Sequence, residues 1–482
     1  MPRFKLSHIT VLLLFIFAGA GCGGSNMKNV DIGSQFSFRQ GYPELRTFTS
    51  GYISDEGATF IRINADVVHG SLIYRKTADD DFRAGIATDI TIYRTIDRDL
   101  QALQTQRFSF EIREQDPGIA NEQSTYSFER SIAMPPGLYI VEVRVTDTDS
   151  RKTTSRRSNA FVPDPVTRIP DLTQVQLLGV YVTDEPYERN ITTYDVSGDI
   201  DSLKFAFQVL KPDTGNPLTV RMELLSFRYD DDLPRTLSML PLTRGSMSYR
   251  GIDYSRYEIV DTQHRRLEAE DAGTIMIEYQ LPRPEAGNYR FRVSLDKETE
   301  ETGSDDAHFR ARDFSVKSRN YPAIRSAREL AKPLYYLMHR REFEQLMAIN
   351  DADSLKSAID KFWLGNIGNK NKARSVIELY YSRVEEANKQ FSNFKEGWMT
   401  DMGMIYVMFG PPWYVEQSLE YMVWHYSYNQ FDARTTFVFE RPRIIGEDYP
   451  FNHFVLVRQR DYQNLEYERV RDWLTGDILS RN

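Results

Sequence analysis

Apolar and polar residues alternate along much of the first third of the chain. Several short segments place an apolar side chain at every second position, which is the pattern of a strand with one buried face. A cluster of prolines between residues 163 and 170 then predicts a linker. The alternating segments are Thr59–Asn64, Asp89–Tyr93, Phe108–Ile112 and Leu138–Val145.

The same plan recurs one domain length later in the chain. The run that begins Gly137-x-Tyr139 and continues with alternating apolar residues has a counterpart that begins Gly287-x-Tyr289, an offset of 287 − 137 = 150 residues. Repetition at this spacing predicts two antiparallel β-sandwiches of immunoglobulin-like or fibronectin-like type. A strand that simply follows a turn would show similar residues, so this alternative stays open. The predicted boundaries are 31–165 for the first sandwich and 171–318 for the second.

Two further features are a polar stretch within the second predicted sandwich and a change from strand-like to helical spacing of apolar residues after it. Residues 228–270 are polar, and we expect them to form an irregular excursion from one edge of the second sandwich. After residue 322 the apolar spacing becomes helical, with a proline interruption at Pro333 and a cap expected at Asp353 or Ser354. The longest predicted helix has an apolar stripe at spacings of three and four. Its members are Ala373, Ile377, Tyr380, Val384, Ala387 and Phe391.

The last part of the chain is predicted to be an α+β domain over residues 325–482, with helices first and a small antiparallel sheet after them. Between the two lies the segment Glu396–Val415. We expect Gly397 to end the preceding helix in a left-handed conformation. The apolar run Met404–Phe409 predicts a short strand that is covered on both faces. The strands predicted after it are 421–426, 435–439 and 453–457, followed by a helix over 462–474.

This segment resembles the GWxTD domain family of bacterial proteins. The likeness covers roughly residues 330–460 and implies no particular activity. It departs from the family at Met402, where a basic residue is usual, so a cation at this position holding an anionic ligand is not expected. The matching signature residues are Gly397, Trp398, Thr400, Asp401, Tyr406, Gly410, Pro411 and Pro412.

The N-terminus resembles a bacterial lipoprotein signal. Arg3 and Lys5 precede an apolar run over Ile9–Ala18, and small residues then lead to Cys22, although Gly19 stands where leucine is commonest. The resemblance implies a signal over residues 1–22, a lipid on Cys22 and a membrane anchor in the cell envelope. Residues 23–30 then form a short tether.

Composition narrows the classes of function. The chain has 482 residues and a net charge of −9 without a long basic tract, so a nucleic-acid partner is not expected. The seven histidines lack the spacing of a zinc site, and there is no phosphate-binding glycine loop, nucleophile elbow or dinucleotide fingerprint. We therefore assign no catalytic residue, metal or cofactor.

Each signature residue admits a structural and a functional interpretation. Trp398 either fills the space between the long helix and the sheet or offers a stacking face to a ligand. Thr400 and Asp401 either bond backbone groups at a turn or bond a substrate. Gly410–Pro412 forms either a rigid strand exit or a recognition loop. Outside the signature, Asp230–Asp232 is either a solvated turn or a set of calcium ligands.

These observations favour a membrane-anchored envelope lipoprotein that acts as a non-catalytic binding or assembly component with an envelope protein as partner. The first alternative is a lipoprotein that binds glycan or peptidoglycan through Trp413 or Trp398. The second is a hydrolase centred on Asp401, which requires that carboxylate to lie in an open cleft beside another titratable group.

Overall fold

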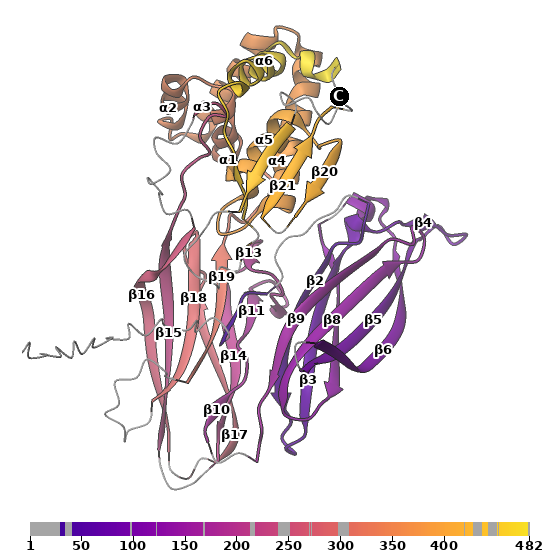
Figure 1. Cartoon of the computed structure of the whole chain (residues 1–482), viewed down its shortest axis with the longest axis vertical. Coiled ribbons are helices and arrows are strands. Elements are labelled where there is room, and N and C mark those ends of the chain that lie inside the picture. Colours follow the sequence, from indigo (N-terminus) through magenta and orange to yellow (C-terminus); the bar gives the residue numbers. More distant parts are fainter. Residues whose placement is uncertain are drawn as a thin grey trace, which may run out of the picture.

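The chain folds into three units, of which two lie side by side and the third lies at one end of the second (Figure 1). The computed structural model describes residues 29–33, 41–96, 99–121, 123–166, 169–212, 217–239, 251–268, 270, 272–296, 308–418, 420–427, 436–441, 451 and 453–480. We call residues 41–162 the first β unit, residues 171–316 the second β unit and residues 321–480 the C-terminal unit. No helix within the described ranges is long and apolar enough to cross a bilayer.

The first β unit consists of two antiparallel sheets around one apolar core. Apolar and polar residues alternate along these strands, so the apolar side chains of both sheets face the space between them. Many of these side chains are isoleucines and valines such as Ile61, Ile90 and Val143. One sheet has the order β2 (Leu45–Ile53), β3 (Thr59–Val68), β7 (Thr125–Ala133). The other contains β4 (Arg75–Lys76), β5 (Phe82–Ile96), β6 (Asp99–Glu114), β8 (Gly137–Asp147) and β9 (Thr153–Val162), with the order β6-β5-β8-β9 and β4 also on β5. Two 3-10 turns connect strands, η2 (His69–Ser71) and η3 (Pro117–Asn121).

The second β unit repeats this plan around a core rich in phenylalanine, in which the rings of Phe205 and Phe291 stack with centroids 4.0 Å apart. Its first sheet contains β10 (Asp171–Leu172), β11 (Gln176–Tyr181), β12 (Tyr187–Asn190), β14 (Ser202–Lys211) and β17 (Gly273–Pro282). Its second contains β15 (Leu218–Tyr229), β16 (Ile252–Leu267), β18 (Gly287–Asp296) and β19 (Phe309–Val316), with the short parallel strands β1 (Val30–Asp31) and β13 (Asp195–Val196) on β19.

Equivalent strands occupy equivalent places in the two β units. The order β6-β5-β8-β9 in the first corresponds to β16-β15-β18-β19 in the second, and β2-β3-β7 corresponds to β11-β14-β17. The repeated tyrosines also match, because Tyr139 donates to the carbonyl of Pro135 at 2.7 Å and Tyr289 donates to that of Glu285 at 2.9 Å, four residues earlier in each case. The 150-residue offset therefore marks two strands with the same neighbours and the same local bond.

One expectation for the second β unit was wrong. Residues 252–267 are not an irregular excursion but the 16-residue strand β16, which pairs with β15 along almost its whole length. The strand is exposed on most of its residues, so its sequence is polar. An antiparallel edge strand that faces water along most of its length carries polar residues at the solvated positions. The predicted excursion also included residues 240–250, which lie outside the described ranges.

The C-terminal unit packs helices against a four-stranded antiparallel sheet. The helices are α1 (Ala327–Ala331), α2 (Arg340–Met347), α3 (Ala352–Ile367), α4 (Lys370–Phe391), α5 (Asp401–Phe409) and α6 (Tyr462–Thr475), with 3-10 turns η4 (Lys332–Tyr336), η5 (Gly397–Met399) and η7 (Asp477–Ser480). The sheet order is β20 (Tyr414–Gln417), β21 (Tyr421–His425), β22 (Thr436–Glu440), β23 (Val455–Leu456). The stripe predicted for the longest helix is largely buried on α4.

Two local expectations in this unit need correction. The residue that caps α3 is Asp351, whose side chain accepts from the backbone N–H of Ser354, not Asp353 or Ser354. The run Met404–Phe409, expected to be a strand, belongs to helix α5. All six of these residues are buried, and a helix buried on every side has no polar face that would reveal its period.

Candidate functional site

The signature residues lie where α4, η5 and α5 meet. Thr400 starts α5 as its N-cap, because its hydroxyl accepts from the backbone N–H of Gly403 at 3.0 Å and donates to the carbonyl of Gly397 at 2.7 Å. This cap satisfies one of the backbone N–H groups that a helix start leaves without an intrahelical partner. The threonine thus bonds backbone groups at a turn, but the turn leads into a helix, not a strand.

The two glycines at this junction permit close backbone contact. A Cβ on Gly397 would lie 2.0 Å from the carbonyl oxygen of Ala387 on α4, and a Cβ on Gly403 would lie 1.9 Å from the carbonyl oxygen of Gly397. Gly397 is absent from the residues with a left-handed φ. The expectation that it ends a helix in that conformation was therefore wrong, and its role is to let η5 lie directly on α4.

Trp398 is enclosed by its neighbours. The side chain is 2 % exposed, and its indole N–H donates to the Glu396 carboxylate at 2.6 Å. The backbone N–H donates to the Asn388 side chain at 3.2 Å, and the carbonyl accepts from the Tyr336 hydroxyl at 2.5 Å. The Tyr336 ring meets the indole edge to face. Neither face of the indole is open for stacking by a ligand in this conformation.

Asp401 forms a buried two-point ion pair with Arg458, a residue that the sequence did not single out. Both carboxylate oxygens lie 2.8 Å from guanidinium nitrogens, and the side chains are 6 % and 5 % exposed. The backbone N–H of Leu456 donates to the same carboxylate at 2.8 Å. This planar two-point geometry is the strongest that arginine and a carboxylate form. The open cleft that the hydrolase interpretation requires around Asp401 is therefore not present in the described residues.

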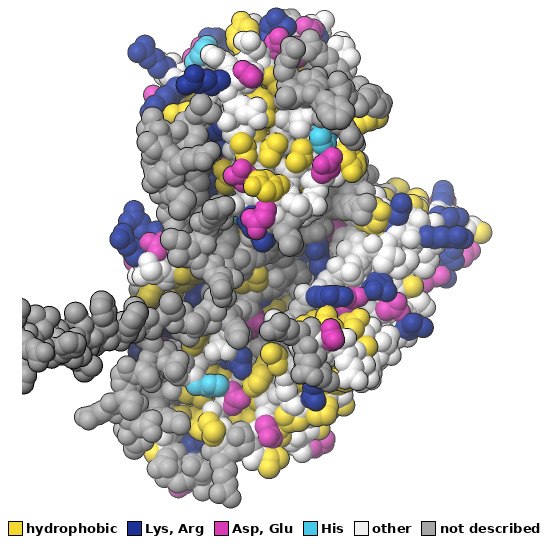
Figure 2. All heavy atoms as spheres, in the orientation of Figure 1, with side chains coloured by type: hydrophobic (Ala, Val, Ile, Leu, Met, Phe, Trp, Pro, Cys, Tyr) yellow, Lys and Arg dark blue, Asp and Glu magenta, His cyan; other side chains and the backbone are white. Residues whose placement is uncertain are grey.

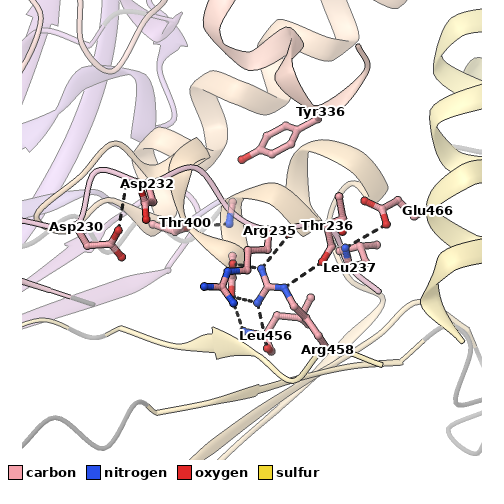
Figure 3. A network of polar contacts seen from close by, with 12 residues as sticks. Asp230, Asp232, Arg235, Thr236, Leu237, Tyr336, Thr400, Leu456, Arg458 and Glu466 are labelled. Carbon is pink, nitrogen blue, oxygen red and sulfur yellow. Dashed lines mark hydrogen bonds and ion pairs between the residues drawn. The ribbon is translucent and has the colours of Figure 1, made fainter. Parts of the chain in front are cut away.

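Arg458 also contacts the second β unit (Figure 3). Its guanidinium donates to the carbonyls of Arg235 at 3.0 Å and Thr236 at 3.1 Å. Both carbonyls belong to the segment that leaves β15 after Tyr229. We call Asp401, Arg458 and residues 230–237 the brace. It joins the start of α5 and the sheet of the C-terminal unit to a loop of another unit more than 160 residues earlier in the chain.

Two further contacts hold the same segment. The backbone N–H of Leu237 donates to Glu466 of α6 at 3.1 Å, and burial raises the pKa of that glutamate. The Lys395 ammonium donates to the Asp232 carbonyl at 2.9 Å and lies 3.8 Å from the Asp230 carboxylate. Asp230 is thus committed to an ion pair. The described residues contain no group of three or more His, Cys, Asp or Glu side chains that would hold a metal.

The remaining signature residues shape the exit from α5. Burial raises the pKa of Tyr406 to about 12. Gly410 follows with φ +84°, a backbone conformation that favours glycine, and a Cβ there would lie 2.7 Å from the Arg383 guanidinium. Its carbonyl accepts from the Tyr426 hydroxyl at 2.7 Å. Pro411 is exposed and Pro412 half-buried, and they deliver the chain to β20.

Exposed aromatic side chains gather at this edge strand. All four residues of β20 are exposed, and β20 is the terminal strand of its sheet as described. Trp413 is 61 % exposed, and Tyr414 and Tyr421 are about half exposed. The ring of Tyr414 stacks on the nearly buried ring of His425. The sequence pointed to Trp413 but did not predict β20.

The comparisons with known proteins identify one domain. Residues 302–475 match the model of the GWxTD domain family. No curated protein matches the chain at a significant level. Similar solved structures include red sea bream transglutaminase (11% identity, TM-score 0.19, covering 58% of this chain and 32% of that one) and Salmonella alpha-2-macroglobulin reacted with methylamine (11% identity, TM-score 0.18, covering 60% and 17%). The chain thus spans about a third or less of either structure.

Proposed function

This chain is a GWxTD domain-containing protein, and from that premise we propose that it is a membrane-anchored lipoprotein of the bacterial cell envelope that acts as a non-catalytic binding or assembly component. The anchor is a lipid on Cys22, the single cysteine of the chain, which follows an apolar segment of signal length. A thioether-linked diacyl anchor gives firm attachment, whereas a single acyl chain gives only marginal membrane binding.

The observation that carries the proposal is the contrast between the signature and the neighbouring edge strand. The side chains of Asp401 and Thr400 bond to other groups of the same protein. This supports a structural role for the signature residues rather than a catalytic one. A few residues later, β20 presents four exposed residues beside the exposed Trp413. A rigid frame that holds an exposed aromatic edge is suited to recognition.

The partner that suits this edge is a protein segment in extended conformation. An edge strand offers backbone groups on its outer side, and an added strand pairs with them while side chains on alternate positions supply specificity. Tyr414, Val415 and Tyr421 provide apolar contact area at this edge. Aromatic residues of this kind carry much of the binding energy in protein interfaces.

The test compares two aromatic variants of the full lipidated chain. A photo-crosslinking residue is placed at position 414, and the envelope protein that becomes attached to it is recovered. The double substitution Trp413→Ala and Tyr421→Ala should abolish this recovery. Tyr467→Ala on α6 is the matched control, because Tyr467 is 71 % exposed and far along the chain from β20. Equal recovery of the same partner by both variants, with unchanged thermal midpoints, would overturn the proposal.

A glycan is the second candidate ligand, favoured by the same cluster of exposed rings. Aromatic faces stack on sugar rings. Tyr414 and Tyr421 lie on the adjacent strands β20 and β21, and Trp413 immediately precedes β20. Sedimentation with purified peptidoglycan separates the two candidates. If retention is lost in Trp413→Ala and is destroyed by a muramidase but not by a protease, the ligand is glycan and the protein-partner proposal fails.

We also propose that the two β units are fibronectin-like or immunoglobulin-like sandwiches. The support is the shared strand order of three and four strands and the repeated tyrosine hydroxyl bond. In such sandwiches the mean strand directions of the two sheets differ by roughly 30°. An experimental structure with sheets crossing near a right angle would contradict this assignment.

A further inference from the structure

The point at which the N-terminal chain joins the fold lies beside an exposed apolar surface. β1 runs parallel to β19, with Val30 opposite Ala311 near the start of β19. The C-terminal end of β19 leads to the C-terminal unit, where Lys317 donates to the carbonyl of Asn393. β1 therefore joins β19 near the start of that strand, whose other end leads to the C-terminal unit.

Contacts connect this entry point to a cleft between the two β units. The Arg310 guanidinium donates to Asn29 at 3.3 Å and stacks on the Phe161 ring at 3.9 Å. Phe161 and His308 line a cleft of about 400 Å³, together with Pro136 and Ile169. The titratable side chains that line the cleft are Asp164, Asp171 and His308, and the last two are bonded to each other at 2.5 Å.

Three aliphatic side chains on the segments that line this cleft project into solvent. Ile169 lines the cleft itself, Leu138 lies opposite Phe161 in the pairing of β8 with β9, and Val166 follows the lining residue Asp164 in the chain. Val166 is 84 % exposed, and Leu138 and Ile169 are each 65 % exposed. We call these three residues the aliphatic patch. Figure 2 shows apolar side chains at the lower end of the β units, where basic and acidic groups are interspersed. Removing exposed aliphatic side chains from water is favourable, and a contiguous apolar patch is a feature of contact surfaces.

The length of chain before Asn29 decides what can reach this patch. Cys22 precedes Asn29 by 29 − 22 = 7 residues, so even a fully extended chain spans no more than roughly 25 Å between them. A lipid on Cys22 would therefore hold the bilayer surface within that distance of Asn29. The patch is linked to Asn29 through Arg310, which contacts both Asn29 and Phe161, and Phe161 lies opposite Leu138.

We infer that Leu138, Val166 and Ile169 form a second membrane contact, in which the aliphatic patch enters the interfacial region of the bilayer beside the lipid anchor. This inference rests on the proposed lipid at Cys22. A tether this short permits the contact, and burial of the three side chains strengthens attachment. The contact orients the molecule, because it turns the C-terminal unit and the edge strand β20 away from the lipid surface.

The experiment uses the full lipidated chain with single cysteines labelled by the environment-sensitive fluorophore NBD. A lipidated Cys22 does not react with the label, so Leu138→Cys, Val166→Cys and Ile169→Cys each report one position. In vesicles of phosphatidylethanolamine and phosphatidylglycerol, all three should show a blue shift and a several-fold rise in emission, quenched by spin-labelled lipid. Tyr467→Cys is the control and should show neither change.

Each outcome decides the inference. Vesicle-bound protein whose patch probes resemble the control would overturn the membrane contact while leaving the anchor intact. Mass spectrometry that finds no lipid on Cys22 would reject the anchor and this inference with it. A blue shift without vesicles that grows with protein concentration would assign the patch to a second copy of the chain and also overturn it. Unchanged thermal midpoints of the labelled variants exclude misfolding as a cause.

Discussion

The side-chain amide of Gln208 on β14 makes two hydrogen bonds with the backbone of Ile53 at the end of β2. The Ile53 N–H donates to the amide oxygen at 2.9 Å, and the amide nitrogen donates to the Ile53 carbonyl at 2.7 Å. Gln208 is 5 % exposed. The Gln208 side chain of the second β unit thereby satisfies backbone groups of the first β unit as a neighbouring strand would. These two bonds fix the orientation of one β unit relative to the other.

Gln208→Ala should loosen the junction between the two β units. The variant leaves a buried N–H and a buried carbonyl unpaired, at a cost of about 1–3 kcal/mol. Hydrogen exchange at the Ile53 amide should accelerate strongly while that of central strands such as β8 stays slow. Gln280→Ala is the control, since Gln280 is exposed and bonds only Ser202 among the described contacts. An unchanged Ile53 exchange rate would contradict the junction's dependence on Gln208.

Asp401→Asn should destabilise the C-terminal unit by about 3–5 kcal/mol, because it leaves the buried Arg458 charge without its counterion. All five tryptophans lie at or beyond residue 363, so tryptophan fluorescence during urea unfolding reports this unit alone. Combining Asp401→Leu with Arg458→Met should recover part of the loss. The exposed pair Arg374–Glu378 serves as control, and replacing both by alanine should leave the midpoint in place. A loss as small as that of the control would show that the brace contributes little.

Gly403→Ala and Gly365→Ala should shift stability in opposite directions, although both glycines lie within helices. A Cβ at Gly403 would overlap the Gly397 carbonyl, and backbone cannot move aside cheaply, so we expect a loss of about 3 kcal/mol or more. A Cβ at Gly365 meets nothing within 4 Å, so alanine should stabilise by about 0.5–1 kcal/mol through helix propensity. The fluorescence-detected urea midpoint measures both. Similar values for the two variants would refute the close contact.

Buried aspartates should make the β units less stable as pH rises. Burial raises the pKa of Asp195, which lies 3.5 Å from Lys317, to about 6 and that of Asp31 likewise to about 6. Because the folded pKa lies above the unfolded value, this stability is fully present below about pH 4 and lost as pH rises through 6. Relative to wild type, Asp195→Asn should gain about 3 kcal/mol between pH 4 and 7. Urea midpoints across this range measure the gain.

The control for this pH dependence is Asp199→Asn, since the Asp199 side chain is 85 % exposed. Its unfolding midpoints should follow those of the wild type at every pH. If Asp195→Asn also follows the wild type, the buried carboxyl is ionised without cost, and the explanation by burial is wrong.

Local pattern was enough to predict several of the strands and the longer helices. Alternation identified β3, β5, β6 and β8, and the repeated Gly-x-Tyr marked two strands that occupy the same place in the two β units. Helical spacing identified α4, and the predicted helix over 462–474 agrees with α6 to within one residue. These predictions were possible because a strand or helix with one buried face has apolar residues at the spacing of that face.

The sequence alone determined the strands with one buried face, the amphipathic helices and the presence of the signature. Only the tertiary structure decided that Met404–Phe409 is a helix, that Gly397 serves contact and not a turn, and that Asp401 pairs with Arg458 across 57 residues. Burial on every side erases the period that distinguishes helix from strand, and an ion pair between distant residues leaves no trace in local spacing. The helical conformation and the ion pair both depend on which segments pack against each other in the folded chain, and local sequence does not specify this.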